Sequence, residues 1–181
     1  MKKLSLIAAA GVSLFSIIAH ADNYLGSRAH AGYVTLGGGY EYFASKRNID
    51  NTGMGIATLG YNLTDTWGVE ALVSSFRTEF KNRVNDPRSI NGNLFAVDAV
   101  YHFAAYNAVE PYLVGGPGFT RLNPNRNDAT SEGNFNLGVG VKTFINKAVG
   151  FGIEARDLYT FTGGKNDVLF SAGITFMMDF C

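Results

Sequence analysis

The sequence predicts an all-β fold: an eight-stranded antiparallel transmembrane β-barrel, up-and-down, after a cleaved signal peptide. Three observations predict it. The chain opens with an export signal, segments of alternating hydrophobicity follow, and the connections between those segments differ in length from one end to the other. A closed barrel spans a membrane without an open sheet edge, so its apolar strand faces can lie against lipid.

The export signal occupies residues 1–21. Two lysines precede an apolar run, and the run ends in a small-x-small cleavage motif, Ala19-His20-Ala21. The run is shorter than the roughly 20 apolar residues that a membrane-spanning helix needs. We therefore expect cleavage after the motif, a periplasmic N-terminal tail over residues 22–31 and an outer-membrane barrel over residues 32–180.

The charge balance argues against nucleic acid as a partner. Cleavage would leave 160 of the 181 residues, and because the signal contains two of the 15 basic side chains and none of the 15 acidic ones, 13 basic and 15 acidic side chains would remain. A nearly neutral chain is not expected to bind nucleic acid. The length suits one domain.

The final strand shows the alternation most plainly. Within residues 168–180, Phe170, Ile174 and Phe176 fall on one face, while Ser171 and Thr175 share the other. Five further segments alternate almost as regularly. With two weaker segments, the predicted strands span residues 32–43, 53–63, 67–80, 93–103, 111–122, 134–145, 148–161 and 168–180.

The segments 53–63 and 111–122 are the weaker ones because Gly and Thr blur their alternation. Pro117 lies in the second of them. A proline removes one donor from a strand ladder, so we expect a β-bulge at this position. The sequence leaves the register of both strands open.

The connections supply independent support for a barrel. Short turns on one rim and long loops on the other are typical of outer-membrane barrels, in which the short turns face the periplasm. We therefore expect both termini in the periplasm. The short connections are residues 62–66, 104–110 and 146–147, and the longer polar ones are residues 44–52, 81–91 and 123–133.

Aromatic residues cluster where the strands would cross the two faces of a bilayer, as in the aromatic girdles of membrane barrels. The group beside the short turns is Tyr61, Trp67, Tyr101, Phe103 and Tyr112. The group beside the loops is Tyr42, Phe43, Phe80, Phe119 and Phe161.

Three segments resemble a known family, the small outer-membrane β-barrel proteins like the transmembrane domain of OmpA, including the OmpX and Ail relatives. They are GYNLTDTWGVE (residues 60–70), EPYLVGGPGF (residues 110–119) and the terminal strand. The terminal strand matches the family's assembly signal, and the chain departs from the family in that Cys181 follows the final aromatic residue. The signal residues are Ser171, Gly173, Phe176, Met178 and Phe180.

The resemblance implies a place in the cell outer membrane, surrounded by membrane lipid and lipopolysaccharide. It also implies partners in the outer-membrane barrel assembly machinery and the periplasmic chaperones. No cofactor is implied. Cys181 is the only cysteine, so it is either a free thiol or the site of an intermolecular disulfide.

Charged residues occupy the inward face of the predicted strands. An eight-stranded lumen is just wide enough for side chains to fill, so we expect no open pore, and buried charges must pair. The pairs are either structural or form a gate that switches partners to pass ions, as proposed for barrels like OmpA. The predicted lumen charge network is Glu41, Glu70, Asp98, Lys142, Glu154 and Arg156.

Catalysis is not expected. Only His30 and His102 follow the signal peptide, and neither belongs to a cluster with a nucleophile or to a metal-ligand pattern. The predicted loops carry basic side chains that would bind lipopolysaccharide phosphates or an anionic host surface ligand, or are simply solvated. These are Lys46, Arg47, Lys81, Arg83, Arg88, Arg126 and Lys165.

These features predict a structural or surface-interaction role, in adhesion or defence, without catalysis. Two alternatives stay open at this point. One is a weak porin that conducts ions or small solutes, and the other is an outer-membrane enzyme that modifies lipid.

Overall fold

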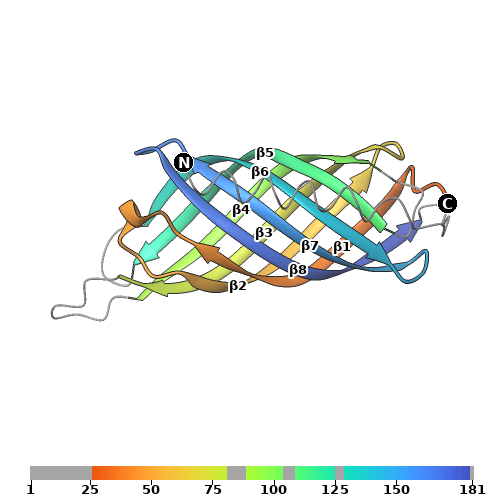
Figure 1. The fold of residues 1–181 in the computed structure, drawn as a ribbon. Coiled ribbons are helices and arrows are strands. Elements are labelled where there is room, and N and C mark those ends of the chain that lie inside the picture. The colour runs from red at the N-terminus through yellow and green to blue at the C-terminus, as the bar shows by residue number, and fades with distance from the viewer. Residues whose placement is uncertain (1–25, 81–88, 104–108, 125–128, 180–181) are drawn as a thin grey trace.

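The computed structural model describes residues 26–80, 89–103, 109–124 and 129–179, which form a closed barrel of eight antiparallel strands (Figure 1). The all-β fold class and the strand number predicted from the sequence are confirmed. The predicted signal peptide, Phe180 and Cys181 lie outside the described residues. The strands are β1 (Ala31–Tyr42), β2 (Thr52–Asn62), β3 (Trp67–Glu79), β4 (Ser89–His102), β5 (Val109–Pro124), β6 (Thr130–Phe144), β7 (Val149–Thr160) and β8 (Lys165–Asp179).

The helical content of the described residues is small. A 3-10 helix, η2 (Ser45–Arg47), lies in the first loop. In the part of the chain that the structure describes, no helix has the length and apolar character needed to cross a membrane.

The register determines how the strands are inclined. Gly32 on β1 leads through successive strand pairs to Asp157 on β7 and Val168 on β8, and Val168 pairs with Tyr42 on β1. The circuit thus returns to β1 ten residues beyond its start, from Gly32 to Tyr42. Such a stagger accompanies the strand tilt of roughly 35–45° that closes a barrel, and Figure 1 shows the strands crossing the barrel obliquely.

The two ends of the barrel differ. We call the end with η2 and the β3–β4, β5–β6 and β7–β8 connections the loop rim, and the end with the β2–β3, β4–β5 and β6–β7 connections the turn rim. In Figure 1 the loop rim is on the left. The chain enters β1 and leaves β8 at the turn rim.

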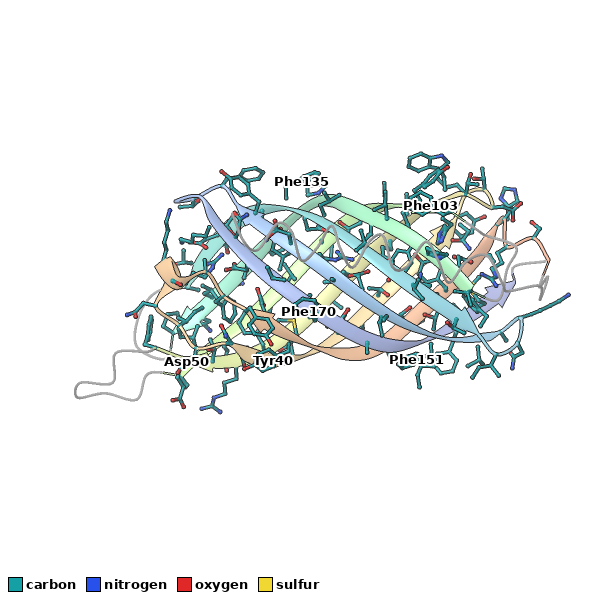
Figure 2. All side chains as sticks on the ribbon, viewed as in Figure 1. Tyr40, Asp50, Phe103, Phe135, Phe151 and Phe170 are labelled. Atoms are coloured by element: carbon teal, nitrogen blue, oxygen red, sulfur yellow. The ribbon has the colours of Figure 1, made fainter. Side chains whose placement is uncertain are left out.

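The outward face of the strands is apolar, as the alternation predicts. Leu36, Leu137 and Phe170 expose 53%, 60% and 51% of their surface. Figure 2 shows side chains such as Tyr40 and Phe170 directed away from the barrel. Such a belt of exposed apolar side chains is the surface that lipid covers in a membrane barrel.

Seven of the ten predicted girdle residues lie on this outer surface, but three do not. Tyr112 is buried because it falls on the inward face of β5, and Phe43 turns into the barrel beyond the end of β1. Phe80 packs against the same interior cluster as Phe43. Their assignment to the girdles was wrong. At the turn rim the girdle is in place, with the Trp67 and Tyr101 ring centroids 4.9 Å apart.

The bulge predicted at Pro117 is also wrong. Ala96 pairs with Gly118 and Ala99 with Gly115, so equal numbers of residues lie between these pairs on β4 and β5. Pro117 faces outward and keeps its partner on β6. The missing donor interrupts the ladder locally without inserting a residue.

Several strands reach further toward the loop rim than the alternation predicted. β4 begins at Ser89 and not near residue 93, β6 begins at Thr130 and not at residue 134, and β5 continues to Pro124. The outward residues in these extensions are polar, which hid them from a search for apolar alternation. The barrel wall is therefore taller than expected on the β4–β6 side.

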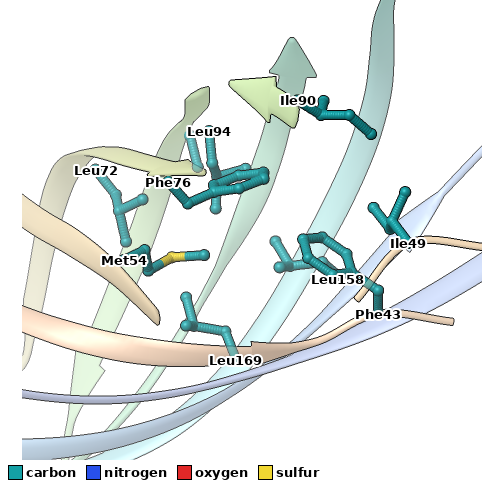
Figure 3. Close-up of a cluster of buried hydrophobic side chains, with 10 residues drawn as sticks. Phe43, Ile49, Met54, Leu72, Phe76, Ile90, Leu94, Leu158 and Leu169 are labelled. Carbon is teal, nitrogen blue, oxygen red and sulfur yellow. The ribbon is translucent and has the colours of Figure 1, made fainter. Parts of the chain in front are cut away.

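An apolar cluster fills the loop-rim half of the lumen, where the sequence predicted a polar lining. Figure 3 shows its side chains directed at one another inside the barrel. Leu72 and Phe76 occupy inward positions of β3 between polar inward residues, and Leu94 occupies an inward position of β4 between Gly92 and Ala96. The cluster consists of Phe43, Ile49, Met54, Leu72, Phe76, Ile90, Leu94, Ala96, Leu158 and Leu169.

Inward glycines make room for inward aromatic rings. A Cβ atom on Gly60 would lie 2.1 Å from the Tyr33 ring, whereas a Cβ atom on Gly55 would meet nothing within 4 Å. We expect Gly60→Ala to lower the free energy of unfolding by roughly 1–3 kcal/mol, the usual cost of overpacking. Gly55→Ala on the same strand is the control, and urea titration of the protein refolded in lipid vesicles measures both. Equal stabilities would contradict the close Tyr33 contact.

Candidate functional site in the barrel lumen

Arg156 is the centre of the lumen. It lies on the inward face of β7 and is 1% exposed. Its guanidinium donates to Glu70 Oε1 on β3 (3.1 Å), to Asp98 Oδ2 on β4 (2.5 Å) and to Glu154 Oε1 on β7 (2.8 Å). One cation thereby ties three strands together across the barrel.

Asp98 has a second donor, because Asn136 Nδ2 on β6 donates to its Oδ1 atom at 2.7 Å. Asn136 Oδ1 in turn accepts from Arg156 at 3.0 Å. Charge-assisted hydrogen bonds of this kind are stronger than neutral ones, and the lumen supplies both oxygens of Asp98 with partners.

Lys142, the second cation, does not pair directly with a carboxylate among the described residues. Its Nζ atom lies 4.2 Å from the ring centroid of Tyr33 and 4.7 Å from that of Tyr112. The hydroxyl groups of these tyrosines donate to Glu70 (2.8 Å) and Glu154 (2.9 Å). Lys142 is therefore linked through two aromatic rings to Arg156 and its three carboxylate partners, which we call the Arg156 group.

A small cavity with a mixed polar and apolar lining lies beside these side chains. Its lining includes Thr58, Glu70, Lys142, Glu154 and Thr175. A water molecule needs at least about 10–15 Å³ of such space, so the cavity volume of about 40 Å³ is large enough for ordered water. This is space for bound water and not for an open aqueous channel.

At the turn rim the chain closes its own barrel. We call residues 26–30, which precede β1, the strap. Arg28 of the strap is buried, forms an ion pair with Glu110 on β5 and stacks on Phe144 of β6, with its guanidinium carbon 3.7 Å from the ring centroid. Burial lowers the pKa of Arg28 and the charge of Glu110 opposes this shift. These residues were predicted to form a periplasmic tail, whereas in the structure they lie across the turn rim as a floor.

Asp65, in the β2–β3 turn, holds the strap in place. Its Oδ1 atom accepts from the Ser27 hydroxyl (2.7 Å), the Arg28 amide (2.8 Å) and the Ala29 amide (3.1 Å). His30 adopts a left-handed backbone with φ of 63° and donates its amide to Asn62 O at 2.8 Å. These bonds direct the Arg28 side chain beneath the barrel.

His102 lies in the same floor. Its Nδ1 atom is 2.5 Å from Glu110 Oε1, close enough for an ion pair when the ring is protonated, although the geometry is not that of an aligned N–H hydrogen bond. The ring is buried. Within the described residues, no group of three His, Cys, Asp or Glu side chains is arranged to hold a metal ion.

At the loop rim Arg47 of η2 reaches across the mouth. It donates to Glu132 on β6 (2.5 Å), Asp167 on β8 (2.7 Å) and Thr160 on β7 (2.7 Å). Lys165 also donates to Glu132, at 2.7 Å. Arg47 and Lys165, predicted as basic loop residues, are thus engaged within the rim itself.

The predicted network divides between two places. Glu70, Asp98, Glu154 and Arg156 meet at the centre, with Lys142 beside them. Glu41 takes no part in the ion pairs of Arg156, and the charges that act on it are those of Asp167 and Arg47 near the loop rim.

The remaining predicted residues are placed as follows. In β8, Ser171 and Gly173 face inward, whereas Phe176 and Met178 are exposed on the outer surface. Lys46 is exposed in the first loop. The predicted basic residues that lie outside the described residues are Lys81, Arg83, Arg88 and Arg126.

Solved structures of small outer-membrane barrels share this fold. OprG from Pseudomonas aeruginosa matches with a TM-score of 0.69 at 13% identity, covering 87% of this chain and all of that one (100%). Ail from Yersinia pestis matches with a TM-score of 0.59 at 15% identity (83% and 99% covered), and Neisserial surface protein A with 0.61 at 19% (83% and 99% covered). At these identities the likeness shows the fold alone.

No individual curated protein sequence matches the chain. The family described as outer membrane protein beta-barrel domain matches residues 7–179, nearly the whole sequence. The match and the closed barrel with its apolar outer belt place the protein in the outer membrane. The chain belongs to the outer membrane protein beta-barrel domain family.

Proposed function

We propose that this protein is a closed, non-conducting outer-membrane barrel with a structural or surface-interaction role, in adhesion or defence, and that it is not an enzyme. The observation that carries the proposal is the sequence of packed layers along the lumen. From the turn rim to the loop rim these are Arg28 with Glu110, the Arg156 group, the apolar cluster and Arg47 across the mouth.

A solute would have to displace every one of these layers. The Arg156 layer resists displacement because moving one partner leaves a buried charge without compensation. The apolar layer offers no hydrogen-bond partner to a hydrated ion. A barrel closed in this way leaves its rims and its outer surface as the regions that meet other molecules.

The surface-interaction part of the proposal takes support from the structural neighbours. Ail is named an attachment invasion locus protein, and one of its structures is a complex with the heparin analogue sucrose octasulfate. We carry over to this chain only the general role, contact at the cell surface. The loop rim is then the end that faces the cell exterior, as in outer-membrane barrels with longer outer loops.

The absence of catalysis is likewise proposed from the placement of the histidines. His102 is buried in the floor beside Glu110 and Arg28. His30 belongs to the strap. A hydrolytic site needs a nucleophile, a base and an orienting group that a substrate can reach.

Weak ion conduction is the second candidate, and the water-sized cavity beside Lys142 favours it. Glu70 and Glu154 each bind Arg156 and also accept from a tyrosine that contacts Lys142. A transfer of either carboxylate from Arg156 to Lys142 would rearrange the centre of the lumen.

Conductance in planar lipid bilayers separates the two candidates. We expect no conductance steps from the refolded protein, and none from Glu154→Gln, because the floor, the apolar cluster and the mouth still close the lumen. Fluorescence of Trp67, the single tryptophan, in the turn-rim girdle serves as the control for insertion. Regular steps that change in Glu154→Gln would reject the closed barrel in favour of the gate.

A further inference from the structure

A polar band crosses the outward face of β3, β4 and β5 near the loop rim. All of its side chains are exposed, and we call the group the collar. It consists of Ser75, Arg77, Asn91, Asn93, Arg121 and Asn123.

The strand register arranges the collar as a compact grid. Asn91 pairs with Arg77 on one side and Asn123 on the other, and Asn93 pairs with Ser75 and Arg121. The two arginines therefore stand two strands apart and are offset by two residues, about 10 Å across the sheet and about 7 Å along it, or roughly 12 Å apart on the diagonal. Asn91 and Asn93 lie on the strand between them. The two guanidinium groups and the amide donors of the asparagines all lie on the outer face of the barrel.

The charge of the collar is positive. Among the described residues no ion pair reaches either arginine, and Arg77 donates one hydrogen bond, to Ser89 Oγ at 3.2 Å. Three of the four carboxylates of these strands, on Glu70, Asp98 and Glu110, are buried in the lumen. The fourth belongs to Glu79, at the loop-rim end of β3.

An apolar surface lies directly beneath the collar. Phe95 follows Asn93 on the outward face of β4, and Phe119 precedes Arg121 on that of β5. Their ring centroids are 5.4 Å apart, and Val97 continues the apolar face toward the turn rim. A ligand that fits both surfaces has an anionic polar head and apolar chains.

We propose that the collar binds the phosphate groups of an acylated, phosphorylated glycolipid in the outer leaflet. The guanidinium forks of Arg77 and Arg121 match phosphate oxygens, and Asn91 and Asn93 donate to sugar oxygens. The acyl chains lie against Phe95, Phe119 and Val97. The inference rests on the loop rim facing the cell exterior, as proposed above, and is independent of whether the lumen conducts.

The test uses the full mature chain in phosphatidylcholine nanodiscs, with a labelled bis-phosphorylated, acylated diglucosamine as the probe. We expect Arg77→Gln/Arg121→Gln to weaken binding of the probe at least roughly tenfold, since hydrogen bonds between charged groups are lost. Removal of the probe's phosphates should weaken its binding to the unsubstituted protein to a similar degree. Trp67 fluorescence and unfolding titrations establish that each variant is folded.

Lys147→Gln is the matched control for Arg121→Gln, because each removes one exposed cation and Lys147 lies at the turn rim. Binding should fall in Arg121→Gln and stay unchanged in Lys147→Gln. Equal losses in the two variants would overturn the site as a general charge effect.

Two further probes separate the possible sources of anionic groups. Millimolar inorganic phosphate should compete only weakly, because it lacks acyl chains. If sucrose octasulfate without acyl chains bound as tightly as the glycolipid and depended equally on Arg77 and Arg121, the collar would be a site for soluble polyanions and the lipid proposal would be rejected. Conductance of the barrel in the earlier experiment would leave this result unaffected.

Discussion

Replacing Arg156 by glutamine should lower the free energy of unfolding by roughly 3–5 kcal/mol, the loss expected when one partner of a buried ion pair is removed. The substitution leaves Glu70, Asp98 and Glu154 close together in the lumen without their shared cation. Urea titration of the protein refolded in lipid vesicles, followed by Trp67 fluorescence, measures the loss.

Lys165→Gln is the control for this measurement. It removes the same charge from a pair with Glu132 at the loop rim, and it should cost less than about 1 kcal/mol because Glu132 keeps its ion pair with Arg47. The double variant Glu154→Gln/Arg156→Gln should recover part of the stability lost in Arg156→Gln, because one uncompensated carboxylate is removed. Similar losses for Arg156→Gln and Lys165→Gln would mean that the lumen is well solvated.

Placing arginine at Val139 should destabilise the barrel by roughly 2–4 kcal/mol, the cost of such a charge near the bilayer midplane. Val139 lies on the outward face in the middle of β6, between Leu137 and Val141, and forms part of the lipid-facing surface. The same urea titration in lipid vesicles gives the value.

Ser131 provides a matched control on the same face of the same strand. It is exposed and lies near the loop rim, so Ser131→Arg should cost only about 0–1 kcal/mol, as for charges near the membrane interface. A neutral Val139→Arg, or equal costs at the two positions, would show that the outer face of β6 does not contact the hydrocarbon core.

The outer surface of the barrel could be read from the sequence because it follows a local rule. Each strand places alternate residues on one face, and lipid requires those residues to be apolar. Positions such as Leu36, Leu137 and Phe170 could therefore be predicted to lie on the outer surface. The rule fails where strands leave the membrane. There the outward residues are polar, as at Asn91 and Asn123, and the strand extensions were assigned to loops.

The lumen was harder to predict because its inward side chains are polar in some layers and apolar in others. The alternation identifies Glu70, Asp98 and Arg156 as inward charges. That the two carboxylates share Arg156 as a partner depends on the register of strands far apart in the chain. Leu72 and Leu94 also face inward, and the alternation alone does not predict that they meet in an apolar cluster. Arg47 shows the same limit of sequence-based prediction. A basic residue in a polar segment is expected to be solvated, and only the fold places it across the mouth of the barrel.

The strap has a consequence for the order in which the barrel is completed. Arg28 precedes the first strand, yet its ion-pair partner Glu110 lies 82 positions further along the chain. Its stacking partner Phe144 is more distant still. Contacts between such remote positions form late, because the intervening chain must first be ordered. We therefore expect the strap, although it precedes β1 in the sequence, to take its final position only after β5 and β6 have joined the barrel wall.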